Sequence, residues 1–243
     1  MAPILYLVRH GEGEHNLNNS HHFRDAHLTD TGKDQCRDLR DTFPYHDDIS
    51  LILASPLRRT IQTAAHAFHL ALKKRQVPFA LVPKAQEISK QACDIGQDCD
   101  VLKAEIPQLI ASGAAGFDQA NLDTSLLEDG WNSKKGIYAP TSEAVRSRAA
   151  ELRTWLWKLP HKHVVLVTHG AFLHYLTEDW SLYDRQRGTA YRNCEYRQFT
   201  FTDESTESEA HLLEVGGNST KIGRPLGVDA QVLQEIEEVE GAK

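Results

Sequence analysis

Long hydrophobic runs are absent from this 243-residue chain, and cysteine and methionine are scarce, at four residues and one. No segment approaches the ~20 consecutive apolar residues that a membrane-spanning helix needs. The first apolar stretch lacks the basic leader and the cleavage site of a secretory signal peptide. The cysteines form no C-x-x-C pair, so their spacing indicates neither a zinc site nor a disulfide framework. We therefore expect a soluble, cytoplasmic protein with reduced thiols.

Positive charge is in short supply as well, because 27 lysine and arginine residues face 34 acidic ones and leave a net charge of −7. Nucleic acids and anionic membranes attract clustered positive charge, so neither is expected as a partner. The 40% apolar and 25% charged composition is that of an ordinary globular protein, which excludes disordered and fibrous classes. A small cationic pocket can still lie within an acidic surface.

Short apolar runs alternate with helical patterns along the chain. The runs predict buried strands at Ile4–Val8, Leu51–Ala54, Phe79–Val82, Val164–Val167 and Glu195–Phe201. Helices are predicted over Thr29–Phe43, from Ser55-Pro56 onward, within Asp100–Ile110 and over Thr141–Leu159. This alternation predicts one domain, residues 1–243, built as a three-layer α/β/α sandwich with a largely parallel central sheet.

Two segments depart from the alternation. Residues 88–140 are richer in Gly, Asp and Ser, and we expect them to form an excursion, or lid, over the C-terminal edge of the strands. Trp131 and Tyr138 in this excursion could either grip a substrate or form its small core. From Ala230 onward the chain is acidic, and its apolar residues are spaced so that a helix could dock through them, but we expect a solvated terminal helix without a function. These residues are Val232, Leu233, Ile236 and Val239. Arg148 lies off the apolar face of its helix and is expected to be solvated as well.

The residues that follow the predicted strands carry the chemistry. Because the C-terminal ends of parallel strands share one edge of a sheet, side chains that follow different strands can meet there. Four predicted strands are followed by Arg9-His10-Gly11, Arg58-Arg59, Glu87 and Thr168-His169-Gly170. Imidazoles and guanidinium groups beside a helix N-terminus suit a compact tetrahedral anion, and phosphate fits this pattern best.

Three of these segments resemble the motifs of the histidine phosphatase (phosphoglycerate mutase-like) superfamily, and they occur in the family's order. They are Leu7–Glu12 with Asn16 shortly after, Ser55–Ala64 and Val167–Gly170. Leu28–Gly32 with Gln35 is similar to the helix that connects the first two motifs in the family. The resemblance extends from the N-terminus to about residue 176.

The resemblance implies a two-step phosphoryl transfer that needs neither a metal nor another cofactor. His10 would attack phosphorus and become a phosphohistidine, which water then hydrolyses. Arg9, Arg59, His169 and Asn16 would bind the phosphate, and His169 would also stabilise the transition state. A neutral imidazole is a competent nucleophile, and a fixed set of cationic donors supplies the electrostatics that phosphoryl transfer requires.

Glu87 would act as the proton donor to the leaving oxygen. A carboxylic acid must be protonated to play this part, so we predict that burial or nearby acids raise the pKa of Glu87. Asp94 lies close in sequence and is a rival for the same role.

One residue of the first motif departs from the family pattern. Gly13 stands where the family usually has Thr or Ser, whose hydroxyl can contact phosphate. The departure resembles a phosphatase-like branch more than the glycolytic mutases. Of the 13 histidines, His15 is the best placed to line the pocket beside His10 and His169. A zinc site made from His15 and the neighbouring histidines has no proper ligand spacing.

We therefore predict a metal-independent phosphomonoester hydrolase, similar to the histidine acid phosphatases, that acts on a small phosphorylated metabolite. Two alternatives stay open: a mutase that moves a phosphoryl group between hydroxyls of one substrate, and a catalytically lapsed protein that binds phosphorylated ligands or protein partners. The sequence leaves the substrate open, because residues 88–140 decide it and their packing cannot be read from the sequence. It leaves the oligomeric state open as well.

Overall fold

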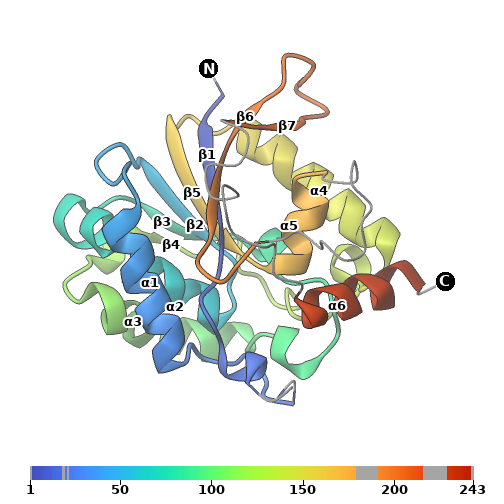
Figure 1. Cartoon of the computed structure of the whole chain (residues 1–243), viewed down its shortest axis with the longest axis horizontal. Helices are drawn as coiled ribbons and strands as arrows, with labels where there is room; N and C mark the ends of the chain where they lie inside the picture. Colours follow the sequence, from blue (N-terminus) through green and yellow to red (C-terminus); the bar gives the residue numbers. More distant parts are fainter. Residues whose placement is uncertain (1, 18–19, 21, 179–190, 216–228, 242–243) are drawn as a thin grey trace.

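The computed structural model describes residues 2–17, 20, 22–178, 191–215 and 229–241. Within them a seven-stranded sheet has the order β4-β3-β2-β5-β1-β6-β7 (Figure 1). The strands are β1 Ile4–Arg9, β2 Leu51–Ala54, β3 Phe79–Leu81, β4 Leu122–Asp123, β5 His163–Thr168, β6 Tyr196–Phe201 and β7 Leu212–Glu214. The first five strands in this order, β4, β3, β2, β5 and β1, pair in parallel, and β6 and β7 add an antiparallel edge. The predicted α/β fold with a largely parallel sheet is confirmed.

Helices cover both faces of the sheet. Helices α1, α2 and α3 lie on one face, and α4, α5 and α6 lie on the other (Figure 1). Their bounds are α1 Asp30–Thr42, α2 Arg58–Ala67, α3 Cys99–Ala114, α4 Ser142–Trp157, α5 Gly170–Leu176 and α6 Ala230–Gly241. Helices α1 and α4 begin where the sequence predicts, because Thr29 and Thr141 cap their first turns through the side-chain oxygen.

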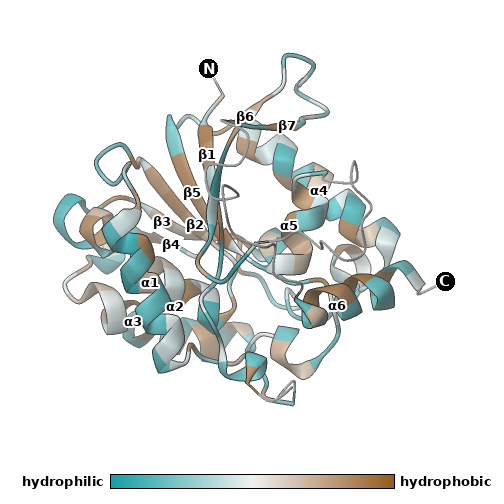
Figure 2. Cartoon of the chain, viewed as in Figure 1, coloured by the Kyte–Doolittle hydropathy of each residue, from teal (hydrophilic) through white to brown (hydrophobic). Residues whose placement is uncertain are grey.

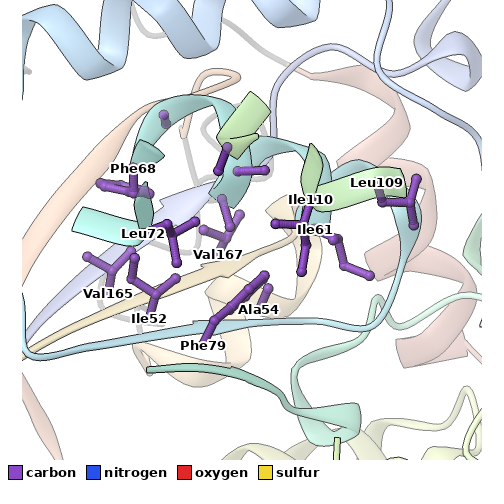
Figure 3. Packing of buried hydrophobic residues seen from close by; sticks show 14 of the residues in the cluster. Ile52, Ala54, Ile61, Phe68, Leu72, Phe79, Leu109, Ile110, Val165 and Val167 are labelled. Carbon is purple, nitrogen blue, oxygen red and sulfur yellow. The ribbon is translucent and has the colours of Figure 1, made fainter. Parts of the chain in front are cut away.

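The central strands are buried on both faces, which explains why they read as unbroken apolar runs (Figure 2). Successive side chains of a strand point to opposite faces of the sheet. Ile52, Ala54, Val165 and Val167 therefore pack toward α2 and α3 (Figure 3). The alternate residues, such as Leu53 and Leu166, pack toward α4 and α5.

Helix α2 begins at Arg58, two residues later than the Ser55-Pro56 signal predicts. Ser55 does not cap this helix, because its Oγ forms a hydrogen bond with Nε2 of His169 at 2.8 Å. The start of α2 is capped instead by a distant residue, because Oδ1 of Asp25 accepts a 2.8 Å hydrogen bond from the Arg58 N–H.

One part of the segment 88–140 belongs to the α/β/α sandwich, and the other part lies at the C-terminal ends of the strands. Its central helix α3 packs on α2, and its strand β4 pairs with β3 at the edge of the sheet. Trp131 is 2% exposed and belongs to the core on this face, and the half-buried Tyr138 packs against the same core. The two ends of the segment return to the C-terminal edge of the strands, where Asp94 and Lys134 lie close to Glu87.

Two predictions of solvent exposure are wrong. Helix α6 docks against the sandwich, with Val232 and Val239 in the core on the α4–α5 face. Arg148 is 1% exposed, and its Nη1 donates hydrogen bonds to the carbonyls of Lys84 (3.0 Å) and Gln86 (2.6 Å). Helix α6 and the Arg148 side chain both contact segments that are remote in sequence. A helical pattern in the sequence does not reveal such contacts.

The four cysteines are all buried and form no disulfide. Among the described residues, no helix combines the length and the apolar character that crossing a bilayer requires.

Candidate active site

The two histidines of the predicted motifs meet at the C-terminal edge of the sheet. Strands β1 and β5 are parallel neighbours in register, so His10 and His169 leave the sheet side by side. Their ring centroids are 5.2 Å apart. Arg59, in the first turn of α2, contacts both rings: its Nε lies 3.3 Å from Nε2 of His10, and its Nη2 lies 3.1 Å from Nδ1 of His169. The sequence prediction that these groups gather around one small site is consistent with this geometry.

Hydrogen bonds fix which nitrogen of His10 carries the proton. Nδ1 lies 2.7 Å from the carbonyl of Gly11, which can only accept, so Nδ1 is the protonated nitrogen. The lone pair is therefore on Nε2, the atom that faces Arg59. Burial, with Arg59, His15 and Arg9 adding to it, holds the pKa of His10 well below its usual value. The ring is thus a neutral base with its lone pair directed toward a guanidinium.

His169 is held in the opposite tautomer. A guanidinium can only donate, so Nδ1 of His169 accepts from Arg59, and Nε2 carries the proton toward Oγ of Ser55 at 2.8 Å. Burial, followed by the charges of Arg59 and of its neighbours, lowers the pKa of His169 well below the usual value. His169 is consequently a neutral and rigidly oriented group beside His10.

His15 fills the space that the missing side chain of Gly13 leaves. A Cβ at position 13 would lie 2.6 Å from Cε1 and Nδ1 of the His15 ring, which is closer than real contacts allow. His15 is buried, and its ring centroid is 5.6 Å from that of His10. The departure from the family pattern at Gly13 therefore has a structural counterpart, because it admits a third imidazole to the site.

The structure distinguishes Arg59 from its neighbour Arg58. Arg59 is 1% exposed and makes a buried ion pair with Asp94, at 2.8 Å between Nη2 and Oδ1. Arg58 points away and pairs with Glu105 of α3. Asp94 also accepts a 2.5 Å hydrogen bond from Oγ of Ser89, so both of its carboxylate oxygens are engaged.

Glu87 lies at the N-terminus of helix α5. Its Oε1 accepts the N–H of Phe172 at 2.9 Å, and its Oε2 accepts the N–H of Ala171 at 3.3 Å. Burial, with the charge of Asp94 adding to it, raises the pKa of Glu87 to about 7, although Arg59 and the backbone donors oppose the shift. The predicted rise in the pKa of this carboxyl group is confirmed, and Asp94 is one of its causes.

Lys134 brings a further cation to the site, which the sequence argument missed. Its Nζ donates a 2.9 Å hydrogen bond to the carbonyl of Glu87. Burial lowers the pKa of Lys134 to about 8, and its charge in turn contributes to the low pKa of His169. Lys134 adopts a positive φ of 54°, which is unusual for a residue with a side chain. No sequence signal marks a lysine at this point of the 88–140 segment.

Arg9 and Asn16 contact the C-terminal segment. Nη2 of Arg9 makes a 2.5 Å ion pair with Oδ2 of Asp229, the residue before α6. Nδ2 of Asn16 donates to Oε1 of Gln231 at 2.9 Å, while Oδ1 of Asn16 accepts the N–H of Gly13. The structure thus brings five of the six predicted residues, Arg9, His10, Arg59, Glu87 and His169, into direct or electrostatic contact, and it links Arg9 and Asn16 to the α6 segment.

Helix α6 contributes an acid that sequence reasoning also missed. Glu235 is 1% exposed, and its Oε1 accepts a 2.8 Å hydrogen bond from Nε2 of Gln231. Burial, followed by the charges of Asp94 and Glu87, raises the pKa of Glu235 well above its usual value. The sequence signal that could have revealed it is the place of Glu235 on the apolar face of the predicted helix, between Val232 and Ile236.

Comparisons with known proteins agree with this geometry. A probable phosphatase from Schizosaccharomyces pombe is 29% identical over 170 residues, which are 68% of this chain and 73% of that protein. Phosphoglycerate mutase-like protein 1 of Arabidopsis thaliana is 28% identical over 262 aligned positions, covering 95% of this chain and 92% of the relative.

Solved structures share the fold at low sequence identity. YhfR from Bacillus stearothermophilus has a TM-score of 0.53 and 18% identity, covering 88% of this chain and 97% of that one. A mutant phosphoserine phosphatase from Entamoeba histolytica, in complex with phosphoserine, has a TM-score of 0.51 and 22% identity, covering 90% and 98%. A family model described as histidine phosphatase superfamily (branch 1) matches residues 5–212. This chain belongs to the histidine phosphatase superfamily.

Proposed function

We propose that the protein is a phosphomonoester hydrolase that acts through a phosphohistidine at His10 and needs no metal. The observation that carries the proposal is the state of the His10 ring. Its Nε2 lone pair is fixed by the Gly11 carbonyl and lies within hydrogen-bond distance of Arg59. A neutral, oriented imidazole beside a guanidinium is what an in-line attack on a phosphate ester requires.

In the first step, Nε2 of His10 forms a bond to phosphorus while the bond to the ester oxygen breaks. Arg59 lies beside Nε2 of His10, where its charge stabilises the transferring oxygens, and His169 orients Arg59 by accepting a hydrogen bond at Nδ1. The leaving oxygen takes the proton of the Glu87 carboxyl, whose pKa of about 7 leaves it largely protonated in slightly acidic solution.

In the second step, water attacks phosphorus and the N–P bond breaks, which returns His10 to its neutral form. The Glu87 carboxylate accepts the proton that the water loses, so the acid is regenerated. Glu87 is preferred to Asp94 for both transfers, because its pKa of about 7 lets its carboxyl group hold and release a proton near neutrality, whereas Asp94 is engaged in a buried ion pair with Arg59.

The substrate that we propose is a small phosphorylated metabolite. His10 is 2% exposed, so only a slender phosphate-bearing group can reach Nε2. The similarity to a probable phosphatase supports hydrolysis as the outcome. The four buried cysteines without disulfides support a cytoplasmic location, and the raised pKa of Glu87 supports a preference for acidic solution like that of the histidine acid phosphatases.

The test is a screen for phosphate release from a panel of phosphometabolites in the presence of EDTA, with wild type and the His10→Ala variant. We expect release by wild type, an acid-labile phosphoprotein after rapid quenching, and loss of both in His10→Ala. His66→Ala is the matched control, because His66 lies elsewhere on α2, facing Ser112. Activity that EDTA abolishes, or that His10→Ala retains, would overturn the proposal, and isomer formation without phosphate release would favour the mutase alternative.

A further inference from the structure

Asp229 links the first motif to the C-terminal helix with its two carboxylate oxygens. Oδ2 makes the 2.5 Å ion pair with Nη2 of Arg9. Oδ1 accepts the backbone N–H groups of Gln231 at 3.0 Å and Val232 at 3.4 Å, and so caps the first turn of α6. The contact between Arg9 and α6 spans 220 positions of the sequence.

The hydrogen bonds of the Arg9 guanidinium show which of its three nitrogens lacks a partner among the described residues and can serve a substrate. Nη1 donates to the carbonyl of Tyr191 at 2.9 Å. Nε is buried and has no hydrogen-bond partner within the described part of the chain. A Cβ placed on Gly170 would lie 3.1 Å from this Nε, so Nε faces the backbone that directly follows His169. The guanidinium is thus held at its far end while its inner N–H is left for a ligand at the site.

Helix α6 is itself fixed in place, so Asp229 is a firm anchor. Val232 packs on Gly170, where a Cβ would lie 2.7 Å from Cγ2 of Val232. At the other end of the helix, Glu240 accepts hydrogen bonds from the hydroxyl of Tyr175 at 2.9 Å and from Ser142 at 3.0 Å.

We propose that Asp229 is a positioning residue of the phosphate site, which holds the Arg9 guanidinium so that its Nε donates to a phosphate oxygen. Helix α6 is on this view a part of the active site. The inference rests on the proposed phosphatase function, since it assigns Arg9 to the phosphate.

The Asp229→Asn variant separates positioning from stability. Asn is as good an N-cap as Asp, so α6 keeps its first turn. An amide has only one acceptor oxygen, however, and cannot serve both the helix and Arg9. Asp229→Ser is a second variant, because its shorter side chain can cap the helix without reaching Arg9.

We expect Asp229→Asn to melt cooperatively, only a few degrees below wild type, and to lose about tenfold or more in kcat/KM, mainly through a higher KM. Competitive inhibition by inorganic phosphate should weaken in parallel. Glu237→Gln, at an exposed position of the same helix, is the control and should behave as wild type. In an Arg9→Met background, Asp229→Asn should have no further effect, because residues that act as a unit are not additive.

Each alternative result has a distinct meaning. If both Asp229 variants keep wild-type kcat/KM while His10→Ala is inactive, the inference is overturned and the phosphatase function stands. If the losses from Arg9→Met and Asp229→Asn are additive, Asp229 acts through the fold alone and the inference is likewise overturned. If His10→Ala retains activity, the proposed function itself fails.

Discussion

At the scale of single residues, the site contains two titrating groups, His10 and Glu87, whose pKa values are shifted in opposite directions. Burial and neighbouring cations keep His10 neutral, since they lower its pKa well below the usual value. Burial and Asp94 keep Glu87 protonated up to about pH 7. The nucleophile must be unprotonated and the acid protonated, so the active form exists between the two pKa values. The slightly acidic side of neutrality is therefore the expected working range.

The basic limb of the pH profile should belong to Glu87. Activity should be full below pH 7 and fall as the pH rises through about 7, because the carboxyl group then loses its proton. In Glu87→Gln this limb should disappear, and kcat for an alkyl phosphate should fall by about 10²- to 10⁴-fold. Steady-state rates from pH 5 to 9 measure both effects. An unchanged basic limb in Glu87→Gln would assign it to another group, such as Lys134.

Gly13 should be intolerant of any side chain, because the ring of His15 occupies the space above it. Gly13→Ser should push His15 away from His10 and lower kcat by about tenfold or more, since small displacements at a reacting centre are costly. The double variant Gly13→Ser/His15→Ala removes the collision and should match His15→Ala alone. A Gly13→Ser enzyme with wild-type kcat would show that the collision is relieved without moving His15 near the nucleophile.

At the scale of secondary-structure elements, the sequence predicts what depends on local pattern. The strands β1, β2 and β5 and the caps of α1 and α4 follow from apolar runs and threonines. These strands place the predicted residues His10, Arg59 and His169 at one edge because parallel strands end together.

What the sequence could not reveal are contacts that depend on how distant elements dock. Ser55 bonds to His169 instead of capping α2, and Asp25 takes over as the cap. Asp229 reaches Arg9 only because α6 packs on α5. Arg148 is buried by carbonyls of the turn that leads to Glu87, although its helical position looks solvent-exposed.

Arg148 should be a structural tie between α4 and that turn. Arg148→Met keeps much of the side-chain volume but leaves the carbonyls of Lys84 and Gln86 without this donor. The free energy of unfolding should fall by about 1–3 kcal/mol, as measured by urea denaturation. Arg146→Met on the same helix removes a largely exposed set of contacts, which includes an ion pair with Glu240 and a hydrogen bond to Ser142, and should cost about 0–1 kcal/mol. Equal effects of the two variants would contradict the assignment.

At the scale of the whole molecule, the net charge of −7 and the cluster of cations are compatible because the cluster is enclosed. Arg59, His10 and His169 come from α2, β1 and β5, so an anion bound between them joins elements from distant parts of the sequence. Such an anion binds only the folded chain and must stabilise it.

Inorganic phosphate or orthovanadate should therefore raise the melting temperature. At a concentration about a hundredfold above Kd, the added stability should be about 2.7 kcal/mol. Calorimetric melts in phosphate, compared with sodium chloride of equal ionic strength, measure it. Arg59→Met should abolish the shift, and a shift that persists in this variant would place the anion elsewhere.

The position of β1 in the sheet has a consequence for how the protein is made. This strand leads directly into His10, the proposed nucleophile, yet its two neighbours are β5 and β6, which begin only at His163 and Tyr196. A ribosome thus delivers His10 first and the strands that enclose it much later, and contacts of such long range also form slowly. A nascent chain released before β6 has emerged should hold the attacking imidazole without a sheet to orient it. The growing polypeptide accordingly acquires catalytic competence only after β6 has been synthesised.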